Sequence, residues 1–248
     1  MAQVAYIGAT SSGFHWAGTV TDPALGNGGL TATLRLVPSG YVGTAQILNP
    51  SGSPTGAVRA TLRQQGQLVH FGLTADITAA TGRFAGARGT LTGTALVTAT
   101  LAIGHLRLHG TLHGASGRAP APPGGARIRH VDGRFLGAEL SLARDGLLMV
   151  VGSATGLVPG PAVLVAGGRA TTAGSRGIIT LFTAGGTLSG VYNVRFPGSG
   201  PLRVETGTWT ITRGSGDLSG AHSTIALRGT RNLRLELIAL RIRGALTL

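Results

Sequence analysis

The segment HFGLTADIT, residues 70–78, decides the fold because its side chains alternate between apolar and polar types. The apolar residues occupy the odd positions, which are Phe71, Leu73, Ala75 and Ile77. Successive side chains of a β-strand point to opposite faces, so this period of two predicts a strand with one buried face. The segment TGR at 81–83 then supplies a turn, because its glycine adopts positive φ without a steric penalty.

The same pattern returns 134 residues further along the chain, and this indicates an internal duplication. The segment ITAATGRFAGARGTLTG at 77–93 aligns with ITRGSGDLSGAHSTIAL at 211–227. The residues that the first segment shares with the second are Ile77, Thr78, Gly82, Gly86, Ala87 and Thr90. The offset persists towards the end of both copies, where Leu101, Leu106, Gly110 and Leu112 match Leu235, Leu240, Gly244 and Leu246.

The two copies are separated by GASGRAPAPPGGA, residues 114–126, which is rich in proline, glycine and alanine and has no apolar period. Such a composition is typical of a linker stiffened by its prolines. We therefore predict three parts: a first β-barrel at 1–115, a linker at 116–125, and a second, more arginine-rich β-barrel at 126–248.

Each copy is expected to hold seven or eight strands and no helix, because short segments with a period of two alternate with glycine turns. In the first copy the expected strands are 3–8, 13–20, 29–37, 40–48, 56–63, 67–79, 86–100 and 101–113. The apolar set changes sides after Gly104 and after Ile238, which predicts a β-bulge or a crossing between layers there. Closure of such strands removes exposed edges, so we predict an all-β protein of two tandem antiparallel barrels.

Two stretches of the first copy, GTVTDPALGNGG at 18–29 and ADITAATGRFAGARGTLTG at 75–93, carry a resemblance. They resemble the bacterial branch of the allene oxide cyclase and dirigent-like barrel superfamily, whose hairpin of Gly–Thr–Gly–Arg–Phe–Ala–Gly–Ala type corresponds to residues 80–87. In the second copy, Asp217 and Leu218 replace the Arg–Phe pair. The resemblance implies eight-stranded antiparallel barrels with a lumen able to hold a small apolar molecule, and it assigns no catalytic residue.

The charge balance favours an anionic partner. All 21 basic residues are arginine, and the formal net charge is +13. Such a balance attracts nucleic acid, lipid headgroups, acidic glycans or an acidic protein; a compositional bias towards arginine on a solvated surface is the alternative. Nucleic acid ranks below the other partners, because stacking platforms need exposed aromatic rings and most aromatic residues here fall within strand patterns.

The absence of cysteine excludes disulfides, thiolate metal sites and a cysteine nucleophile. The start MAQVAYIGATSSG shows no signal peptide, so we expect a cytoplasmic protein by default, with secretion left open if the start was processed. No apolar run approaches the roughly 20 residues of a transmembrane helix, so no membrane-spanning segment is expected.

Three histidines, His105, His109 and His113, recur at every fourth position of GHLRLHGTLHG, residues 104–114. Four strand residues span about 13 Å, whereas zinc needs each nitrogen at about 2.0–2.1 Å, so one ion does not bridge two of them on a single strand. We expect no metal site and a solvated polar face shared with Arg107. A row that contacts an anion or a ligand is the alternative.

Further arginines gather near the C-terminus. The candidate residues for ligand or anion binding are Arg107, His109, Arg228, Arg231, Arg234, Arg241 and Arg243. Glu139, Glu205 and Glu236 lie in apparent strands, where each is either an acid in a barrel lumen or, as we favour, a surface ion-pair partner.

No Gly–x–Ser–x–Gly elbow is present, and no lysine exists for a phosphate-binding loop. We therefore expect a non-catalytic binding or scaffold protein without a cofactor, whose arginine-rich surface docks on an anionic partner or assembly. The alternative is a cyclase, isomerase or carrier that holds a small apolar ligand in a barrel lumen.

Overall fold

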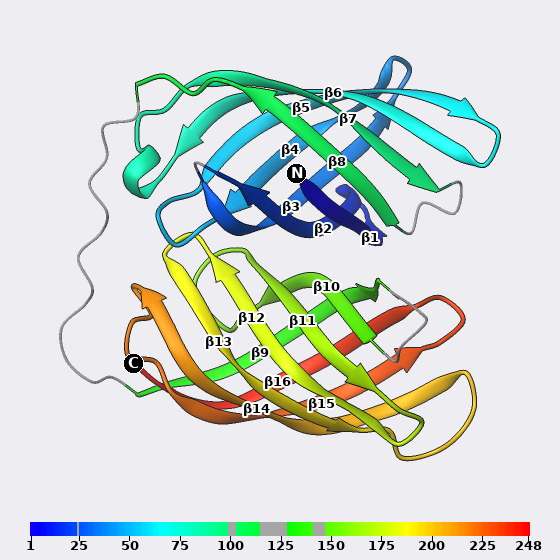
Figure 1. Ribbon diagram of the computed structural model, residues 1–248, viewed down its shortest axis with the longest axis vertical. Coiled ribbons are helices and arrows are strands. Elements are labelled where there is room, and N and C mark those ends of the chain that lie inside the picture. The colour runs from blue at the N-terminus through cyan, green and yellow to red at the C-terminus, as the bar shows by residue number, and fades with distance from the viewer. Residues whose placement is uncertain (24, 99–102, 115–127, 141–146) are drawn as a thin grey trace. The chain divides into compact units, whose positions relative to one another are not determined.

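The computed structural model describes residues 1–23, 25–98, 103–114, 128–140 and 147–248 (Figure 1). The chain divides into two compact units, Met1–Pro120 and Ala121–Leu248. Within the described residues each unit is a closed antiparallel barrel of eight strands, which confirms the predicted fold class and the duplication of a barrel. The predicted linker at 116–125 lies outside the described residues. No helix in the described ranges is long and apolar enough to cross a membrane.

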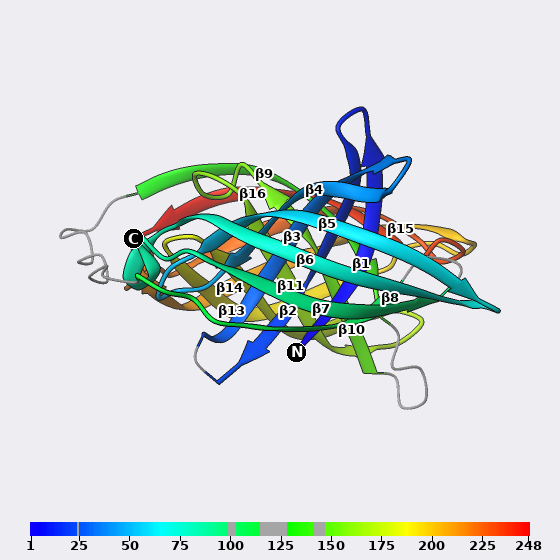
Figure 2. The ribbon, with the colours of Figure 1, turned by 90° about the horizontal axis from the view of Figure 1, so that it is seen from above.

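In the first barrel each strand pairs with the next, and the last strand returns to pair with the first. The strands are β1 (Ala2–Thr10), β2 (Gly13–Asp22), β3 (Gly26–Val37), β4 (Gly40–Leu48), β5 (Pro54–Gln65), β6 (Leu68–Ala80), β7 (Gly89–Thr98) and β8 (Ile103–Gly110). A single 3₁₀ turn, η1 (Gly82–Phe84), lies between β6 and β7. Each strand expected from the sequence of this copy overlaps one of these strands. Figure 2 shows β5 to β8 running side by side along one wall.

The second barrel repeats this order. Its strands are β9 (Ile128–Glu139), β10 (Leu147–Thr155), β11 (Ala162–Ala170), β12 (Gly174–Thr183), β13 (Gly186–Arg195), β14 (Leu202–Gly216), β15 (Ser223–Asn232) and β16 (Leu237–Thr247). The pairing of β16 with β9 closes the ring. Consecutive antiparallel strands need only short hairpin connections, which the glycine turns of the sequence provide.

The alternation seen in the sequence becomes the division between the inside and the outside of each barrel. In β6, Phe71, Ala75 and Ile77 are buried. In β14, Trp209 and Ile211 are buried while the threonines between and beside them face outwards. The core of each barrel is therefore built from the apolar half of every strand, as the period of two requires.

The duplication extends to irregular details of the backbone. The register of β5 against β6 shifts between Thr55 and Gly56, and the register of β13 against β14 shifts between Ser189 and Gly190, 134 residues later. The turn that follows is also repeated, with Gly82 at φ 60° and its counterpart Gly216 at φ 61°. Such β-bulges bend the strand and increase its twist, so both barrels curve at the same point.

The bulge or crossing expected after Gly104 and Ile238 is not found. The strand β8 begins at Ile103 and β16 begins at Leu237, and neither pairing shows a register shift at these residues. In the second copy only Leu237 of the outward apolar set lies in the strand, because Leu235 belongs to the turn before β16. The equivalent Leu101 lies outside the described residues.

We expect Gly216→Ala to destabilise the protein more than Gly66→Ala, although both glycines have φ 61°. A Cβ at Gly216 would lie 2.1 Å from the carbonyl oxygen of Gly185, whereas a Cβ at Gly66 meets no atom within 4 Å. The left-handed conformation alone costs about 1 kcal/mol, and the clash should bring the total for Gly216→Ala to about 3 kcal/mol or more. Urea denaturation of the full chain measures both values, and equal losses would contradict the argument.

Candidate functional site

Seven exposed arginines lie on adjoining strands of the outer wall of the second barrel, apart from an eighth, Arg213, near the end of β14. We call them the arginine belt, which consists of Arg134, Arg169, Arg176, Arg195, Arg228, Arg241 and Arg243. Each belongs to the outward half of its strand, because the residues on either side of it along the strand face the lumen. The strand β14, which lies between β13 and β15, contributes Thr206 and Thr208 to the same wall.

The strand register places these arginines side by side across the sheet. Arg228 lies opposite Arg241, and Arg241 lies opposite Arg134. Because neighbouring strands are about 4.8 Å apart, the three residues follow one another at that spacing. On the other side of Arg228, Thr206 connects the row to Arg195. The result is one continuous row of cationic and hydroxyl side chains.

A single acid, Asp132, lies among the belt residues in the strand register. Arg241 donates to it through Nε, at 2.9 Å from Oδ1, and through Nη2, at 2.7 Å from Oδ2, and Arg243 donates to Oδ2 at 3.2 Å. These hydrogen bonds, Arg241 first, hold the pKa of Asp132 well below its usual range. The side chains of the remaining belt arginines form no hydrogen bond or ion pair with any other described residue: they are Arg134, Arg169, Arg176, Arg195 and Arg228.

Two hollows open between the belt arginines, where small residues leave space on the wall. The first, of about 410 Å³, is lined by Arg134, Arg228 and Arg241 together with Ala239. The second, of about 490 Å³, is lined by Arg169, Arg176 and Arg195 together with Ala173 and Gly174. Guanidinium groups at the edge of a solvent-filled hollow can bind an anion in a bidentate manner.

Of the arginines expected from the sequence near the C-terminus, Arg228, Arg241 and Arg243 lie in the belt. Arg234 is exposed in the turn after β15, where its backbone N–H donates to the side chain of Asn232 at 3.0 Å. Arg231 lies elsewhere, because it belongs to the inward half of β15 and is buried.

The other two expected residues, Arg107 and His109, lie in the first barrel on the outward half of β8. His109 Nε2 is 3.0 Å from the Thr92 hydroxyl, and His109 lines a shallow hollow of about 540 Å³ with Arg59 and Thr74. The first barrel therefore has its own, less basic polar wall.

The histidines of β8 share this wall as the period of two predicts. His105 is exposed like His109, and the backbone of His113 pairs with that of Arg88 beyond the end of the strand. No group of three or more potential metal-ligating side chains occurs in the part of the chain that the structure describes.

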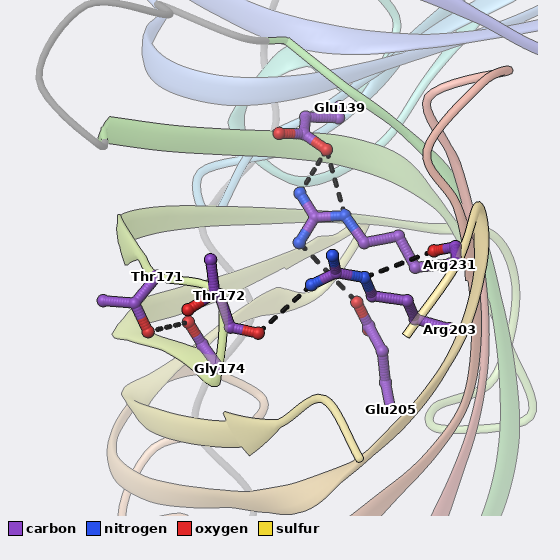
Figure 3. Close-up of polar contacts among 8 residues, drawn as sticks. Glu139, Thr171, Thr172, Gly174, Arg203, Glu205 and Arg231 are labelled. Carbon is purple, nitrogen blue, oxygen red and sulfur yellow. Dashed lines mark hydrogen bonds and ion pairs between the residues drawn. The ribbon is translucent and has the colours of Figure 1, made fainter. Parts of the chain in front are cut away.

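The lumen of the second barrel holds a cluster of charged groups near one end (Figure 3). Arg231 donates through Nε to Glu139 Oε2 at 3.0 Å, and its Nη2 donates to the same oxygen. On its other side, Arg231 Nη1 lies 3.7 Å from Glu205 Oε1. The side chain of Arg231 is 4% exposed and that of Glu205 is 6% exposed, so this ion cluster is almost completely removed from water.

Burial governs the chemistry of the cluster. It raises the pKa of Glu205 to about 7, with Arg231 opposing the rise and Glu139 adding to it. Burial also raises the pKa of Tyr192, whose hydroxyl lies beside Ser175 but makes no hydrogen bond among the described residues. The cavity between these groups measures only about 40 Å³, which is room for water and not for an organic substrate.

The first barrel has a larger cavity than the one beside Glu205 and Arg231, but its lining is mostly apolar. This cavity, of about 380 Å³, opens at the end where β2 and β4 finish. Most of the lining is apolar and includes Leu25, Ile47, Leu91, Leu106 and Leu108, with Asp22 the acid among the lining residues. The inner positions equivalent to Glu205 and Arg231, 134 residues earlier, are the buried Phe71 and Val97.

Sequence reasoning favoured a surface position for Glu205, and the structure corrects this because the side chain lies in the lumen. The signal was present, since Glu205 has the same parity as Trp209 and Ile211 in β14. Arg231 likewise shares the parity of Ile225 and Leu227. The belt members Arg169, Arg176 and Arg195 were not singled out, because nothing local in the sequence brings them to one wall.

No protein-family model, curated protein or solved structure matches the chain.

We expect Glu205→Gln to stabilise the protein at pH 8 but not at pH 4. Because the pKa of Glu205 is raised to about 7 in the folded state, the folded protein binds the proton more tightly, and wild-type stability falls as pH rises through the interval between the unfolded and folded pKa values. A neutral glutamine avoids this loss, which a shift of that size puts at up to about 3 kcal/mol. Urea denaturation at several pH values measures it.

The matched control is Asp217→Asn, which removes an exposed acid from the same barrel. The control should follow the wild-type pH profile closely. If the stability difference between Glu205→Gln and wild type is the same at pH 4 and pH 8, the buried carboxyl does not titrate as described.

Proposed function

We propose that this protein is a non-catalytic binding protein that docks on an anionic partner through the arginine belt. The observation that carries the proposal is the row Arg228–Arg241–Arg134, in which like charges lie on three successive strands. Like charges directly opposite each other destabilise a sheet, and Asp132 offsets only part of this repulsion. A bound anion would relieve the rest, and it would also use the five belt arginines that lack an internal partner.

The distribution of cavities supports a binding role over a catalytic one. An enzyme of small molecules needs a pocket that admits the substrate and, in the same place, a convergent acid or base. In the described residues the second barrel has the buried Glu205 and Arg231 around a cavity of only about 40 Å³, which leaves no room for a substrate. The first-barrel cavity of about 380 Å³ has the room, but its lining is mostly apolar, with Asp22 and His109 as the acid and the histidine on it.

The proposal includes a relationship to the allene oxide cyclase and dirigent-like barrel superfamily. It is supported by the hairpin at residues 80–87 and by the eight-stranded antiparallel barrel in which that hairpin lies. Since the superfamily includes cyclases, proteins that steer radical coupling and many barrels of unknown role, this relationship is compatible with a binding role.

A second candidate function is the binding of a small apolar ligand in the first barrel, by a carrier, cyclase or isomerase. The cavity of about 380 Å³ favours it, because ligand pockets are typically about 300–1,000 Å³ and mostly apolar. The occupant would be a neutral molecule that contacts Leu91, Leu106 and Leu108.

The docking proposal predicts that the double variant Arg134→Gln/Arg228→Gln binds dextran sulfate at least about tenfold more weakly than wild type, because two charge-assisted contacts are lost. Wild-type affinity should fall as NaCl rises from about 50 to about 200 mM, and the variant should show a shallower dependence. Calorimetry of the full chain measures both quantities.

The matched control is Arg35→Gln/Arg63→Gln, which removes the same charge from exposed positions of the first barrel. The control should retain wild-type affinity. Equal losses in the two double variants would mean that net charge and not the belt attracts the polymer, and an affinity that does not change with salt would exclude electrostatic docking.

The second candidate predicts that a neutral apolar fluorophore, N-phenyl-1-naphthylamine, binds the wild-type protein. It should bind Leu91→Trp more weakly, because the larger tryptophan ring fills the cavity. The control is Leu96→Trp on the outward half of the same strand, where the side chain is exposed. Fluorescence titration measures the affinities. If Leu91→Trp binds the probe as well as Leu96→Trp does, the cavity is not the site.

A further inference from the structure

We infer that the anionic partner of the arginine belt is a linear acidic polysaccharide, that is, a polymer of hydroxyl-rich rings bearing carboxylate or sulfate groups. This inference rests on the proposed function and specifies its ligand. It follows from the uncharged hydrogen-bonding groups and the hollows that lie between the arginines of the belt, and from the lack of an aromatic ring among the belt residues.

The belt offers a path for an extended chain and not a single anion site. From Arg169 on β11 to Arg134 on β9 it crosses the wall through six strand-to-strand steps, which at about 4.8 Å each give a path of about 29 Å. Every strand of this path except β14 contributes an arginine to the belt, and β14 contributes Thr206 and Thr208. A polymer with repeated negative charges would therefore meet a guanidinium group along most of its length.

Uncharged hydrogen-bonding groups are interleaved with the charges. Thr206 lies in the row between Arg195 and Arg228, and Thr208 follows Asn193 in the next row. None of these three side chains makes a hydrogen bond to another described residue. Hydroxyl and amide groups of this kind both donate and accept, so they suit sugar hydroxyls, whereas an unsubstituted polyphosphate chain offers acceptors only.

The hollows give room for a ring between the charges. The hollows, of about 410 and 490 Å³, lie beside the arginines. Arg195 and Arg228, which line them, stand in strand register with Thr206 of β14. A polymer that consists of charge alone would not use this space. A polymer with a bulky neutral part between successive anionic groups would fill it while the arginines hold the anions.

The belt has no aromatic ring with which to hold a nucleic acid base. On the strands that carry the belt, Phe135, Tyr192 and Trp209 are buried. Phe182 on β12 is partly exposed, but it lies six residues from Arg176 along the strand and lines neither of the two hollows. Base-stacking platforms depend on exposed rings. The observations therefore favour a polymer of sugar rings over single-stranded DNA or RNA.

The test compares polymers of similar charge with the full chain at about 100 mM NaCl, where the Debye length is about 10 Å. The probes are polygalacturonate, dextran sulfate, polyphosphate and oligothymidylate, with neutral dextran as the control. We expect polygalacturonate and dextran sulfate to bind at least about tenfold more tightly than polyphosphate or oligothymidylate, since only the first two present both anions and hydroxyls. Neutral dextran should not bind.

A variant pair tests the role of the threonine hydroxyls. In Thr206→Val/Thr208→Val the hydroxyls are removed with little change of shape, and we expect the affinity for polygalacturonate to fall about fivefold while that for polyphosphate stays unchanged. The matched control is Thr61→Val/Thr94→Val, at exposed positions of the first barrel.

If polyphosphate or oligothymidylate binds as tightly as the polysaccharides, or if the threonine variant affects all polymers equally, the polysaccharide inference is overturned and the docking proposal stands. If no polyanion binds even at low salt, both are overturned.

Discussion

Closure of the hydrogen-bonded ring is the constraint on which the rest of the structure depends. In a closed barrel every strand has two neighbours, so a slip of one residue would turn a whole strand's apolar set towards the solvent. The pairing of β8 with β1 and of β16 with β9 therefore fixes which residues face the lumen. Phe71 and Trp209 are buried, and Arg107 and Arg241 exposed, for this single reason.

Comparison of the two copies shows which features of the closed barrel are kept and which side chains have changed. The bulges at Gly56 and Gly190 and the turns at Gly82 and Gly216 are repeated, because they shape the backbone. Side chains have diverged on both faces. Inside, Glu205 and Arg231 stand where Phe71 and Val97 pack; outside, Arg228 stands where the first copy has Thr94. The common wall thus supports an apolar cavity in one barrel and a basic exterior in the other.

The sequence predicted what depends on local alternation. The strands, the turn at Gly82 and the outward position of Arg241 all follow from a period of two and from the turn requirement for positive φ. The arginine belt could be predicted only in part, because the neighbours of Arg241 are set by pairing with β9, more than a hundred residues away. For Arg231 the two signals conflict: its alternation in β15 predicts a lumenal position, whereas its charge predicts a surface position. The structure resolves the conflict, because Glu139, a distant residue in the sequence, pairs with the buried guanidinium group.

The contrast between Arg231 and the belt shows which arginines serve the fold and which remain available. Inside the barrel an unpaired guanidinium would be strongly destabilising, so Arg231 is buried only together with Glu139 and Glu205. On the outer wall, water solvates Arg134 and Arg228, and the fold does not require a partner for them. The internal cluster is complete and leaves little space, whereas the belt has unused donors beside open hollows. For that reason we place the proposed binding site on the outside of this barrel and not in its lumen.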